Sequence, residues 1–485
     1  MNTYIGIDLG TSSVKLLLTA ADGRILNAVT KEYPVYYPQS GWSEQNPEDW
    51  ISATRLGLDA LLNGYRRDEV KGVSFGGQMH GLVLLDDRDE VIRPAILWND
   101  GRTQKQTDRL NTVVGKETLS RYTANVAFAG FTAPKILWVE ENEPQNFVRI
   151  AKIMLPKDYL AYMLTGVHVT DYSDASGMLL MDVQNKCWSK EMCAYCHVDE
   201  KWLPKLCESY ACIGTVRDEY GLPNAIVTAG AGDNAAAAIG TGTVQDGDCN
   251  ISLGTSGTVF IAQNAFSVDG HNALHSFAHA NGKYHLMGCI LSAASCNKWW
   301  SEEILNTKDF FAEQDGLDTL LGKNDVFFLP YLMGERSPHN DVSARGAFIG
   351  MRPDTTRKEM TLAVLEGVAF ALRDCVEVVR SNGLAITRTK ICGGGAKSEI
   401  WKKIIANVLN LPVATVGIEE GPAYGAAILA MVGAGEYKDI SEATAAIVKT
   451  KDVVLPDPII AAAYQEKYRV FRQAYPALKG VFAQI

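Results

Sequence analysis

The chain has 485 residues, 47% of them hydrophobic and 21% charged, a composition typical of a globular protein with two or three domains. Its formal net charge of −10 argues against nucleic acid or an anionic membrane as the main partner. No apolar run approaches the ~20 residues that a membrane-spanning helix needs. The N-terminus lacks the basic segment with which a secretory signal begins, so we expect a cytoplasmic protein.

The first predicted elements are two β-type runs joined by a tight turn of Gly10, Thr11 and Ser12. Asp8 ends the incoming strand, and Lys15 follows the turn. Backbone N–H groups near a glycine, together with hydroxyl groups, can bind phosphate oxygens. Asp8 would repel a bare phosphate but would favour one that carries Mg²⁺. The alternative is an ordinary β-hairpin, and this stretch alone does not separate the two interpretations.

The elements that follow suit a mixed α/β sheet. They are a strand over residues 24–35, a helix capped by Asn46 that ends near residue 63, a strand over 70–75, a glycine-rich loop over 76–81 and a strand over 82–86. Helices with loops are expected over residues 103–165 and irregular structure over 166–225.

Two loops in this region carry a mixture of side chains that suits a polyhydroxylated ligand. They supply an aromatic face, an amide, an acid, an imidazole and a guanidinium from Met79, His80, Trp98, Asn99, Asp100 and Arg102. The alternative for His80 is an ordinary structural histidine whose ring nitrogens are satisfied within the protein.

Ten cysteines occur in the chain, five of them between Cys187 and Cys212. The sequence from Cys193 to His197 has the letter pattern of c-type haem attachment, and the Cys193–Cys196 pair could also be half of a zinc site. Because haem attachment requires an exported protein and Cys207 and Cys212 are wrongly spaced for zinc, we interpret these residues as reduced, mostly buried thiols.

A second glycine-rich turn, residues 230–235, has the Gly-x-Gly-x-x-Ala pattern of a dinucleotide-binding fold. Asp233 contradicts that interpretation, because a carboxylate at this point would occupy the place of the pyrophosphate. An acid at the start of a helix can instead act as a base that removes a proton from a substrate hydroxyl during phosphoryl transfer. The remaining alternative is a plain helix N-cap.

The second half of the chain begins near Asp246 and repeats the opening pattern. Residues 250–261 again read as strand, Gly-Thr-Ser turn and strand, so we predict a duplicated fold with domains 1–245 and 246–485. A long helix over 359–381, a strand over 389–392 that runs into Gly393–Gly395, and a helix capped by Ser398 follow. No Gly-x-x-x-x-Gly-Lys-Ser/Thr motif is present, which excludes a P-loop.

These motifs resemble, in order and over the full length, those of the FGGY carbohydrate kinases. Residues 7–15 and 253–257 are similar to the family's two phosphate motifs, residues 393–396 to its adenosine motif, and residues 130–142 and 346–366 to its two signatures. The resemblance implies an α/β fold of two ribonuclease-H-like, actin-like ATPase domains with the active site in the cleft between them.

The resemblance also implies ATP and Mg²⁺ as ligands, with Asp233 as the catalytic base and Asp8 beside the metal. It implies metal contacts from Asp8 and Asp233, sugar contacts from Met79, His80, Trp98, Asn99, Asp100, Arg102, Asp233 and Asn234, and nucleotide contacts from Gly10, Thr11, Ser12, Lys15, Gly254, Thr255, Gly394, Gly395, Ala396 and Glu399. Ser13 departs from the glycine that family members often have at this position. A homodimer is a family-level expectation.

Within the family, residues 77–81 and 97–102 are most similar to the members that phosphorylate D-xylulose, whereas glycerol kinases carry Arg-Glu in place of Met79-His80. The implied activity is ATP-dependent phosphorylation of D-xylulose to D-xylulose 5-phosphate. The nearest alternative is a kinase of another ketose or polyol, such as ribulose, because small sugar differences change binding by only ~1–3 kcal/mol. An Hsp70- or actin-like ATPase and an NAD-dependent oxidoreductase are the alternatives from other classes.

Overall fold

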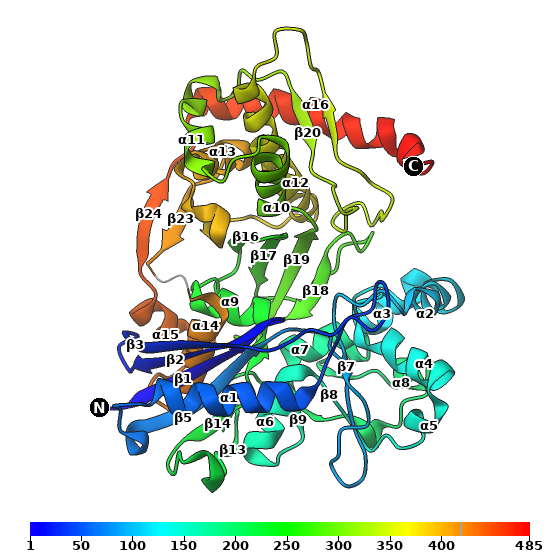
Figure 1. Ribbon diagram of the computed structural model, residues 1–485, viewed down its shortest axis with the longest axis vertical. Helices are drawn as coiled ribbons and strands as arrows, with labels where there is room; N and C mark the ends of the chain where they lie inside the picture. The colour runs from blue at the N-terminus through cyan, green and yellow to red at the C-terminus, as the bar shows by residue number, and fades with distance from the viewer. Residues whose placement is uncertain (418–419) are drawn as a thin grey trace.

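The computed structural model describes residues 1–417 and 420–485. Figure 1 shows two α/β lobes stacked along the long axis, the lower one built mainly from the first half of the chain and the upper one from the second half. Each lobe is centred on a mixed sheet, and across the described residues both sheets have seven strands. The predicted fold class is therefore confirmed.

The first sheet is built on the opening hairpin. Its first three strands, β1 (Thr3–Leu9), β2 (Ser13–Ala20) and β3 (Ile25–Glu32), are antiparallel, as predicted. β5 (Val70–Gly77) then pairs parallel to β1, and β14 (Ile226–Thr228) parallel to β5. β1 and β5 are apolar because both faces of the sheet are covered.

The second sheet repeats this arrangement. β16 (Asp248–Leu253), β17 (Gly257–Gln263) and β19 (Tyr284–Ile290) are antiparallel, and β22 (Arg388–Cys392) and β23 (Val413–Val416) extend the sheet in parallel from β16. β18 (His275–Ala278) and β24 (Thr450–Val454) form its two edges. The domain boundary near residue 245 precedes β16 and stays a prediction.

Two helices show how capping sets the element boundaries. α1 (Pro47–Leu61) begins at the predicted Asn46 cap and ends two residues before the predicted stop, at Leu61. α12 (Arg357–Ser381) begins earlier than predicted, because Thr356 and Glu359 form a reciprocal capping box. α13 (Glu399–Leu409) has the predicted Ser398 cap, whose hydroxyl accepts from the Trp401 N–H.

Two helices lie where the lobes meet and pack against each other, α9 (Asp233–Gly240) and α14 (Gly421–Gly433) (Figure 1). Although α14 comes late in the chain, it packs on β1 and β5 of the first sheet. A Cβ added at Gly6 would lie 1.9 Å from the Ala423 carbonyl oxygen, and one at Gly425 would lie 1.8 Å from that of Ala236. Both positions therefore require glycine, because the backbones touch.

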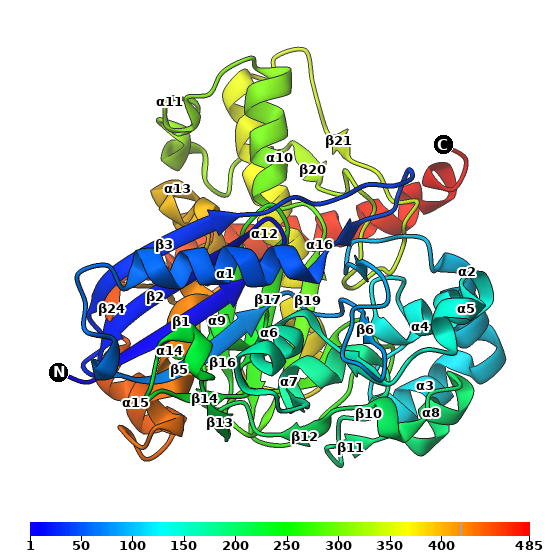
Figure 2. The ribbon, with the colours of Figure 1, turned by 60° about the horizontal axis from the view of Figure 1, so that its bottom comes forward.

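Of the other elements of the N-terminal half, β13 (Cys212–Thr215) and β15 (Ala231–Gly232) complete the first sheet, and the rest cover that sheet or lie beside it, many of them at the lower right of Figure 2. The rest are β4 (Glu44–Gln45), β6 (Val83–Leu85), β7 (Ala95–Ile96), α2 (Gln104–Arg109), α3 (Lys116–Thr123), α4 (Thr132–Asn142), α5 (Pro144–Phe147), β8 (Lys152–Met154), α6 (Pro156–Thr165), β9 (Val169–Asp171), α7 (Tyr172–Ala175), β10 (Met181–Asp182), β11 (Cys187–Trp188), α8 (Lys190–Tyr195) and β12 (Lys205–Cys207). The region 166–225, expected to be irregular, is thus a chain of short elements, each too short to give a periodic signal.

The remaining elements belong to the C-terminal half. They are α10 (Ala294–Trp299), α11 (Phe310–Gln314), β20 (Phe327–Leu329), β21 (Ala347–Ile349), α15 (Ile440–Ile447) and α16 (Pro458–Phe482). Among the described residues, none of the helices combines the length and the apolar character that crossing a bilayer would require.

The ten cysteines are free thiols. Cys193 and Cys196, from the haem-like pattern, are buried in a hydrophobic cluster with Met192 and Leu203. Within residues 1–417 and 420–485, no group of three or more His, Cys, Asp or Glu side chains is arranged to bind a metal ion.

Candidate active site

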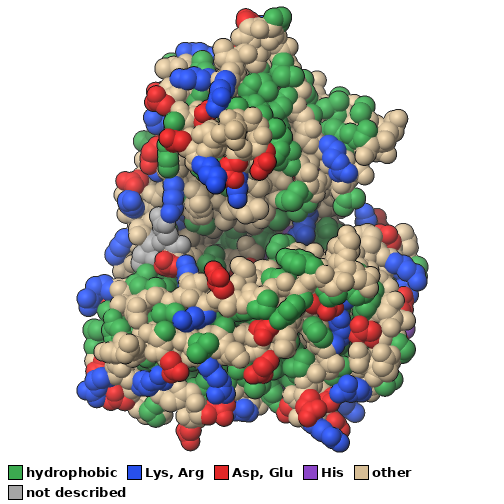
Figure 3. Space-filling model, viewed as in Figure 1, with side chains coloured by type: hydrophobic (Ala, Val, Ile, Leu, Met, Phe, Trp, Pro, Cys, Tyr) green, Lys and Arg blue, Asp and Glu red, His purple; other side chains and the backbone are tan. Residues whose placement is uncertain are grey.

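The space-filling view shows a hollow between the two lobes (Figure 3). The turns after β1 and β16 occupy equivalent places in the two sheets. The first turn is held by side chains on both sides: Tyr33 donates to the Gly10 carbonyl, and Gln45 Nε2 donates to the Thr11 carbonyl at 2.6 Å. Trp98 Nε1 also donates to Thr11 Oγ1 at 3.0 Å. The turn is therefore fixed before any ligand arrives.

Asp8 lies at the end of β1, directly opposite Lys15 on β2. Burial, and then the charge of Asp233, raise the pKa of Asp8 to about 7, although the charge of Lys15 opposes this. Lys15 Nζ is 2.6 Å from Glu420 Oε2, which precedes α14. The predicted phosphate lysine is thus engaged in an ion pair with Glu420.

Asp233 is the first residue of α9, and Gly232 is the N-cap. The N-cap alternative for Asp233 is therefore wrong. Its Oδ1 instead accepts from the backbone N–H and the side-chain amide of Asn234, at 2.7 and 2.9 Å. Burial raises the pKa of Asp233 to about 6, and the two Asn234 bonds oppose that rise. Such a carboxylate is a suitable proton acceptor near neutral pH.

The donor set around Asp8 and Asp233 fits a magnesium ion. The two carboxyl groups interact unfavourably enough that Asp233 contributes to the raised pKa of Asp8. A divalent cation bound by these carboxyl groups would relieve this repulsion, and Mg²⁺ prefers one or two carboxylates together with water and phosphate oxygens.

His80 has a backbone φ of +69°, in the left-handed region that is unusual for a residue other than glycine. Its carbonyl oxygen accepts from Lys135 Nζ at 2.7 Å and from Thr132 Oγ1 at 3.1 Å. Its Nδ1 is 2.9 Å from the Gly177 carbonyl oxygen, which can only accept, so Nδ1 carries the proton. Because burial lowers the pKa of His80 to about 3, the ring is neutral and Nε2 is left as an acceptor.

Lys135 is a supporting residue that the sequence motifs did not indicate. It lies on α4, within the signature stretch 130–142, and its side chain is buried. Besides His80, its Nζ donates to the Gly130 carbonyl at 2.7 Å, so it ties two loops together. A single lysine within an apolar helical run was the signal that could have identified it.

Met79 lies beside the candidate base. Its side chain is buried, and a Cβ added at Gly232 would lie 2.9 Å from Met79 Cγ. The fold therefore brings Met79 next to Gly232, the residue before Asp233.

Asp100 and Arg102 are bonded mainly to each other. Arg102 forms a bidentate ion pair with Asp100, with Nη2 2.7 Å from Oδ2, and its Nη1 is 2.7 Å from Glu44 Oε1. The guanidinium also stacks over the Trp42 ring at 3.8 Å. Both side chains are almost fully buried, whereas Trp98 and Asn99 beside them are exposed.

A cavity of about 440 Å³ lies on the C-terminal side and contains three of the predicted nucleotide contacts, Thr255, Gly394 and Gly395. It is also lined by residues that sequence reasoning missed, among them Ser295, Asn297, Phe310, Phe311 and Gln314. Ala396 and Glu399 line a second cavity, which shares Gly394 with the first, and there Glu399 pairs with Lys402 at 2.6 Å. Aromatic rings beside a glycine-rich loop form a suitable environment for a nucleobase.

The C-terminal lobe also contributes to the sugar side of the cleft. Arg336 lies over the Phe128 ring at 5.6 Å, and its charge helps to lower the pKa of His80. His275 on β18 stacks against Phe277, and both rings lie near Phe131.

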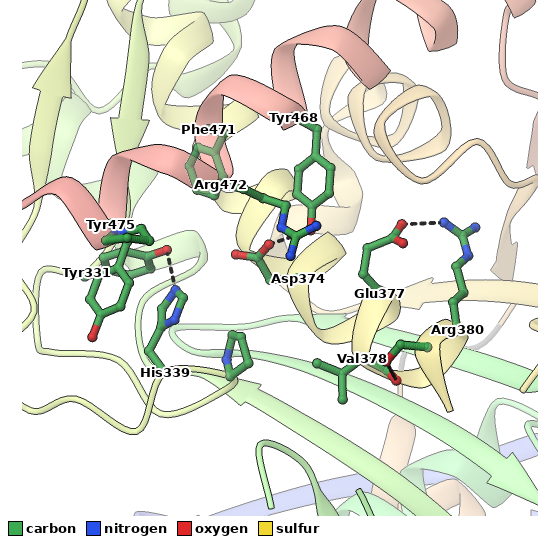
Figure 4. A pocket seen from close by; sticks show the side chains of 13 residues that line it. Tyr331, His339, Asp374, Glu377, Val378, Arg380, Tyr468, Phe471, Arg472 and Tyr475 are labelled. Atoms are coloured by element: carbon green, nitrogen blue, oxygen red, sulfur yellow. Dashed lines mark hydrogen bonds and ion pairs between the residues drawn. The ribbon is translucent and has the colours of Figure 1, made fainter. Parts of the chain in front are cut away.

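A separate cavity of about 620 Å³ lies between α12 and α16 (Figure 4). Its charged groups are largely satisfied within the protein: Tyr468 donates to Asp374 at 2.5 Å, and Glu377 pairs with Arg380 at 2.8 Å. None of the candidate site residues lines it.

Comparison with known proteins identifies the family. Residues 3–240 match the N-terminal domain, and residues 249–434 the C-terminal domain, of the FGGY family of carbohydrate kinases. The chain belongs to this family. It is 39% identical to the xylulose kinase of Escherichia coli K12 over 99% of this chain and 100% of that protein.

Solved structures show the same relationship. The structure of a protein from Brucella ovis described as a xyloylose kinase is 40% identical, with a TM-score of 0.94 over 99% of this chain and 100% of that one. A gluconate kinase from Lactobacillus acidophilus is 25% identical, with a TM-score of 0.95 over 100% of this chain and 99% of that one.

Proposed function

We propose that this protein is a D-xylulose kinase that transfers the γ-phosphoryl group of ATP to D-xylulose, giving D-xylulose 5-phosphate and ADP. The observation that supports the proposal is the packing of Met79, one of the two candidate sugar contacts, on Gly232, the residue before Asp233. The relatives from Escherichia coli and Brucella ovis, each about two-fifths identical, carry names that agree with this substrate.

In the proposed mechanism, Asp233 accepts the proton of the sugar hydroxyl as its oxygen attacks the γ-phosphorus and the bond to ADP breaks. Asn234 fixes the Asp233 carboxylate through two hydrogen bonds, so the base is oriented before the sugar binds. His80 Nε2 accepts a hydrogen bond from a sugar hydroxyl, because its Nδ1 proton is used by Gly177.

The phosphates of ATP lie, in this proposal, between the turns at Gly10–Ser12 and Gly254–Thr255, with the nucleoside in the cavity lined by Gly394 and Gly395. Asp8 and Asp233 would hold Mg²⁺, which when bound supplies positive charge to the phosphate oxygens in the transition state. The cytoplasmic location and the homodimer expected from the sequence stay predictions.

The test is ADP release with Mg-ATP over a panel of D-xylulose, D-ribulose, glycerol and gluconate, the last because a structural relative carries that name. We expect D-xylulose to give the highest kcat/KM; a clearly better substrate among the others would replace it in the proposal. Asp233→Asn should lower kcat by on the order of 10²–10⁴-fold while ATP still binds. Wild-type turnover in that variant would remove Asp233 as the base.

A further inference from the structure

A short segment from Asp171 to Gly177 lies behind the candidate site and contacts it at two points. It contains the end of β9, the four-residue helix α7 and the turn that follows. The Ser173 hydroxyl accepts from the Gly232 backbone N–H at 3.1 Å, and the Gly177 carbonyl accepts from His80 Nδ1 at 2.9 Å. The segment thus contacts the residue before Asp233 as well as the candidate sugar histidine.

Ser173 is itself fixed by Asp171. Asp171 Oδ2 accepts from the Ser173 hydroxyl at 2.5 Å, from the Ser173 N–H at 2.9 Å and from the Ser209 hydroxyl at 2.7 Å. Because the hydroxyl proton of Ser173 is used by Asp171, a lone pair of the same oxygen is directed to Gly232 N–H. The orientation of this hydroxyl is therefore determined by the carboxylate.

Asp171 is anchored in turn by a buried lysine. Lys157 Nζ is 2.9 Å from Asp171 Oδ1, 2.6 Å from Asp158 Oδ1 and 3.5 Å from Asp174 Oδ2. The side chains of these four residues are at most 1% exposed. Breaking a buried pair of this kind would leave a buried charge without its partner, so the arrangement resists movement.

The same lysine packs against the end of β5, next to the loop that carries His80. A Cβ added at Gly77 would lie 2.7 Å from Lys157 Cβ. Asp174 lies close enough to Asp233 for the charge of Asp233 to contribute to its raised pKa, which burial dominates. The charged cluster is therefore directly behind the candidate catalytic groups.

We propose that Ser173 is a positioning residue for phosphoryl transfer: held by Asp171 and Lys157, it fixes Gly232 N–H and so directs the Asp233 carboxylate at the sugar hydroxyl. Through Gly177, the same rigid segment fixes His80, so the base and the sugar contact are placed by one piece of the chain. This inference rests on the proposed function in that it takes Asp233 to be the base.

Ser173→Ala and Ser209→Ala form a matched pair that tests the proposal. Both serines are buried and donate to the same Asp171 oxygen, but only the Ser173 hydroxyl contacts Gly232 N–H. Steady-state kinetics with D-xylulose and Mg-ATP would be measured for both variants, together with their melting temperatures. Small misplacements of a reacting group can cost on the order of 10²-fold in rate.

We expect similar losses of melting temperature in the two variants, but a 10- to 100-fold lower kcat only in Ser173→Ala, with the KM for ATP within about twofold of wild type. Ser173→Cys, which keeps a weak acceptor atom, should recover part of the rate that Ser173→Ala loses. If the alanine variant does not fold, the cysteine variant is compared with Ser209→Ala in its place. Two results would overturn the proposal. One is an equal kcat in Ser173→Ala and Ser209→Ala, and the other is a wild-type kcat in both Ser173 variants.

The failure of the proposed function would look different. A wild-type enzyme that does not phosphorylate D-xylulose, or an Asp233→Asn variant that retains turnover, would contradict the substrate or the base. An active wild type that depends on Asp233 but not on Ser173 would contradict only the positioning role.

Discussion

The carboxyl groups of Asp8 and Asp233, from opposite ends of the N-terminal half of the chain, lie close enough that the charge of Asp233 is, after burial, the main cause of the raised pKa of Asp8. Two such acids cannot both ionise without cost in a buried site. A bound divalent cation would relieve this cost, and without one the cost makes the stability of the protein depend on pH.

The first prediction concerns that stability. The pKa of Asp8 is raised from 3.8 to about 7 by folding, so the folded protein binds this proton more tightly than the unfolded chain. The resulting stabilisation is complete below pH 3.8 and is lost as the pH rises through about 7. Asp8→Asn should therefore raise the melting temperature at pH 8, by roughly 2 °C or more, and raise it by clearly less at pH 5, because part of the stabilisation is still present there.

Differential scanning calorimetry without nucleotide, at pH 5 and pH 8, would measure this difference. Asp87→Asn, a change at an exposed aspartate, is the matched control and should show no such pattern. If Asp8→Asn is destabilising at pH 8, the carboxyl group is compensated in the ligand-free protein and the cation-site interpretation is wrong.

The second prediction is a pH dependence of catalysis. A base with a pKa of about 6 must lose its proton to act, so kcat/KM should decrease as the pH falls below that value. Because Mg²⁺ favours the charged form of nearby carboxyl groups, the midpoint should move lower as Mg²⁺ is raised. Rate measurements from pH 5 to pH 9 at limiting and saturating Mg²⁺ would test this, and a profile that is flat to pH 5 at both concentrations would contradict it.

The third prediction separates sugar binding from nucleotide binding. His80→Ala removes the Nε2 acceptor and the stacking on Phe131 (ring centroids 4.6 Å apart), so the KM for D-xylulose should rise by about tenfold or more. The KM for ATP should stay within about twofold. His168→Ala, a change at a half-buried histidine bonded to the Ile153 carbonyl, is the control. A proportional rise in both KM values for His80→Ala would argue against a sugar contact.

The fourth prediction uses two adjacent glycines of the nucleotide cavity. A Cβ at Gly395 would lie 2.8 Å from Leu253 Cβ, whereas one at Gly394 would meet no protein atom within 4 Å. Gly395→Ala should lower the melting temperature, because neither Leu253 nor Trp401 has space to move. Gly394→Ala should leave the melting temperature unchanged but raise the KM for ATP, because its methyl group enters the cavity. Equal effects of the two changes on the melting temperature and on the KM for ATP would show that this loop does not contact the nucleotide.

Much of the fold was predictable because its signals are local. The hairpins around Gly10 and Gly254 combine alternating apolar residues with turn residues, and caps such as Asn46 and Ser398 act within one helical turn. The region 166–225 lacked such signals because its elements are only two to six residues long.

The two strand–turn–strand units, the acids Asp8 and Asp233, and the order of motifs that marks the family could all be recognised in the amino-acid sequence. Which of these groups meet became visible only in the folded chain. It packs α14 on the first sheet, brings Met79 against Gly232, directs Asp100 and Arg102 to each other, and places Ser173 behind Asp233. These contacts could not be predicted because hydrogen bonds and buried ion pairs form between residues far apart in the chain, and no local periodicity encodes their partners.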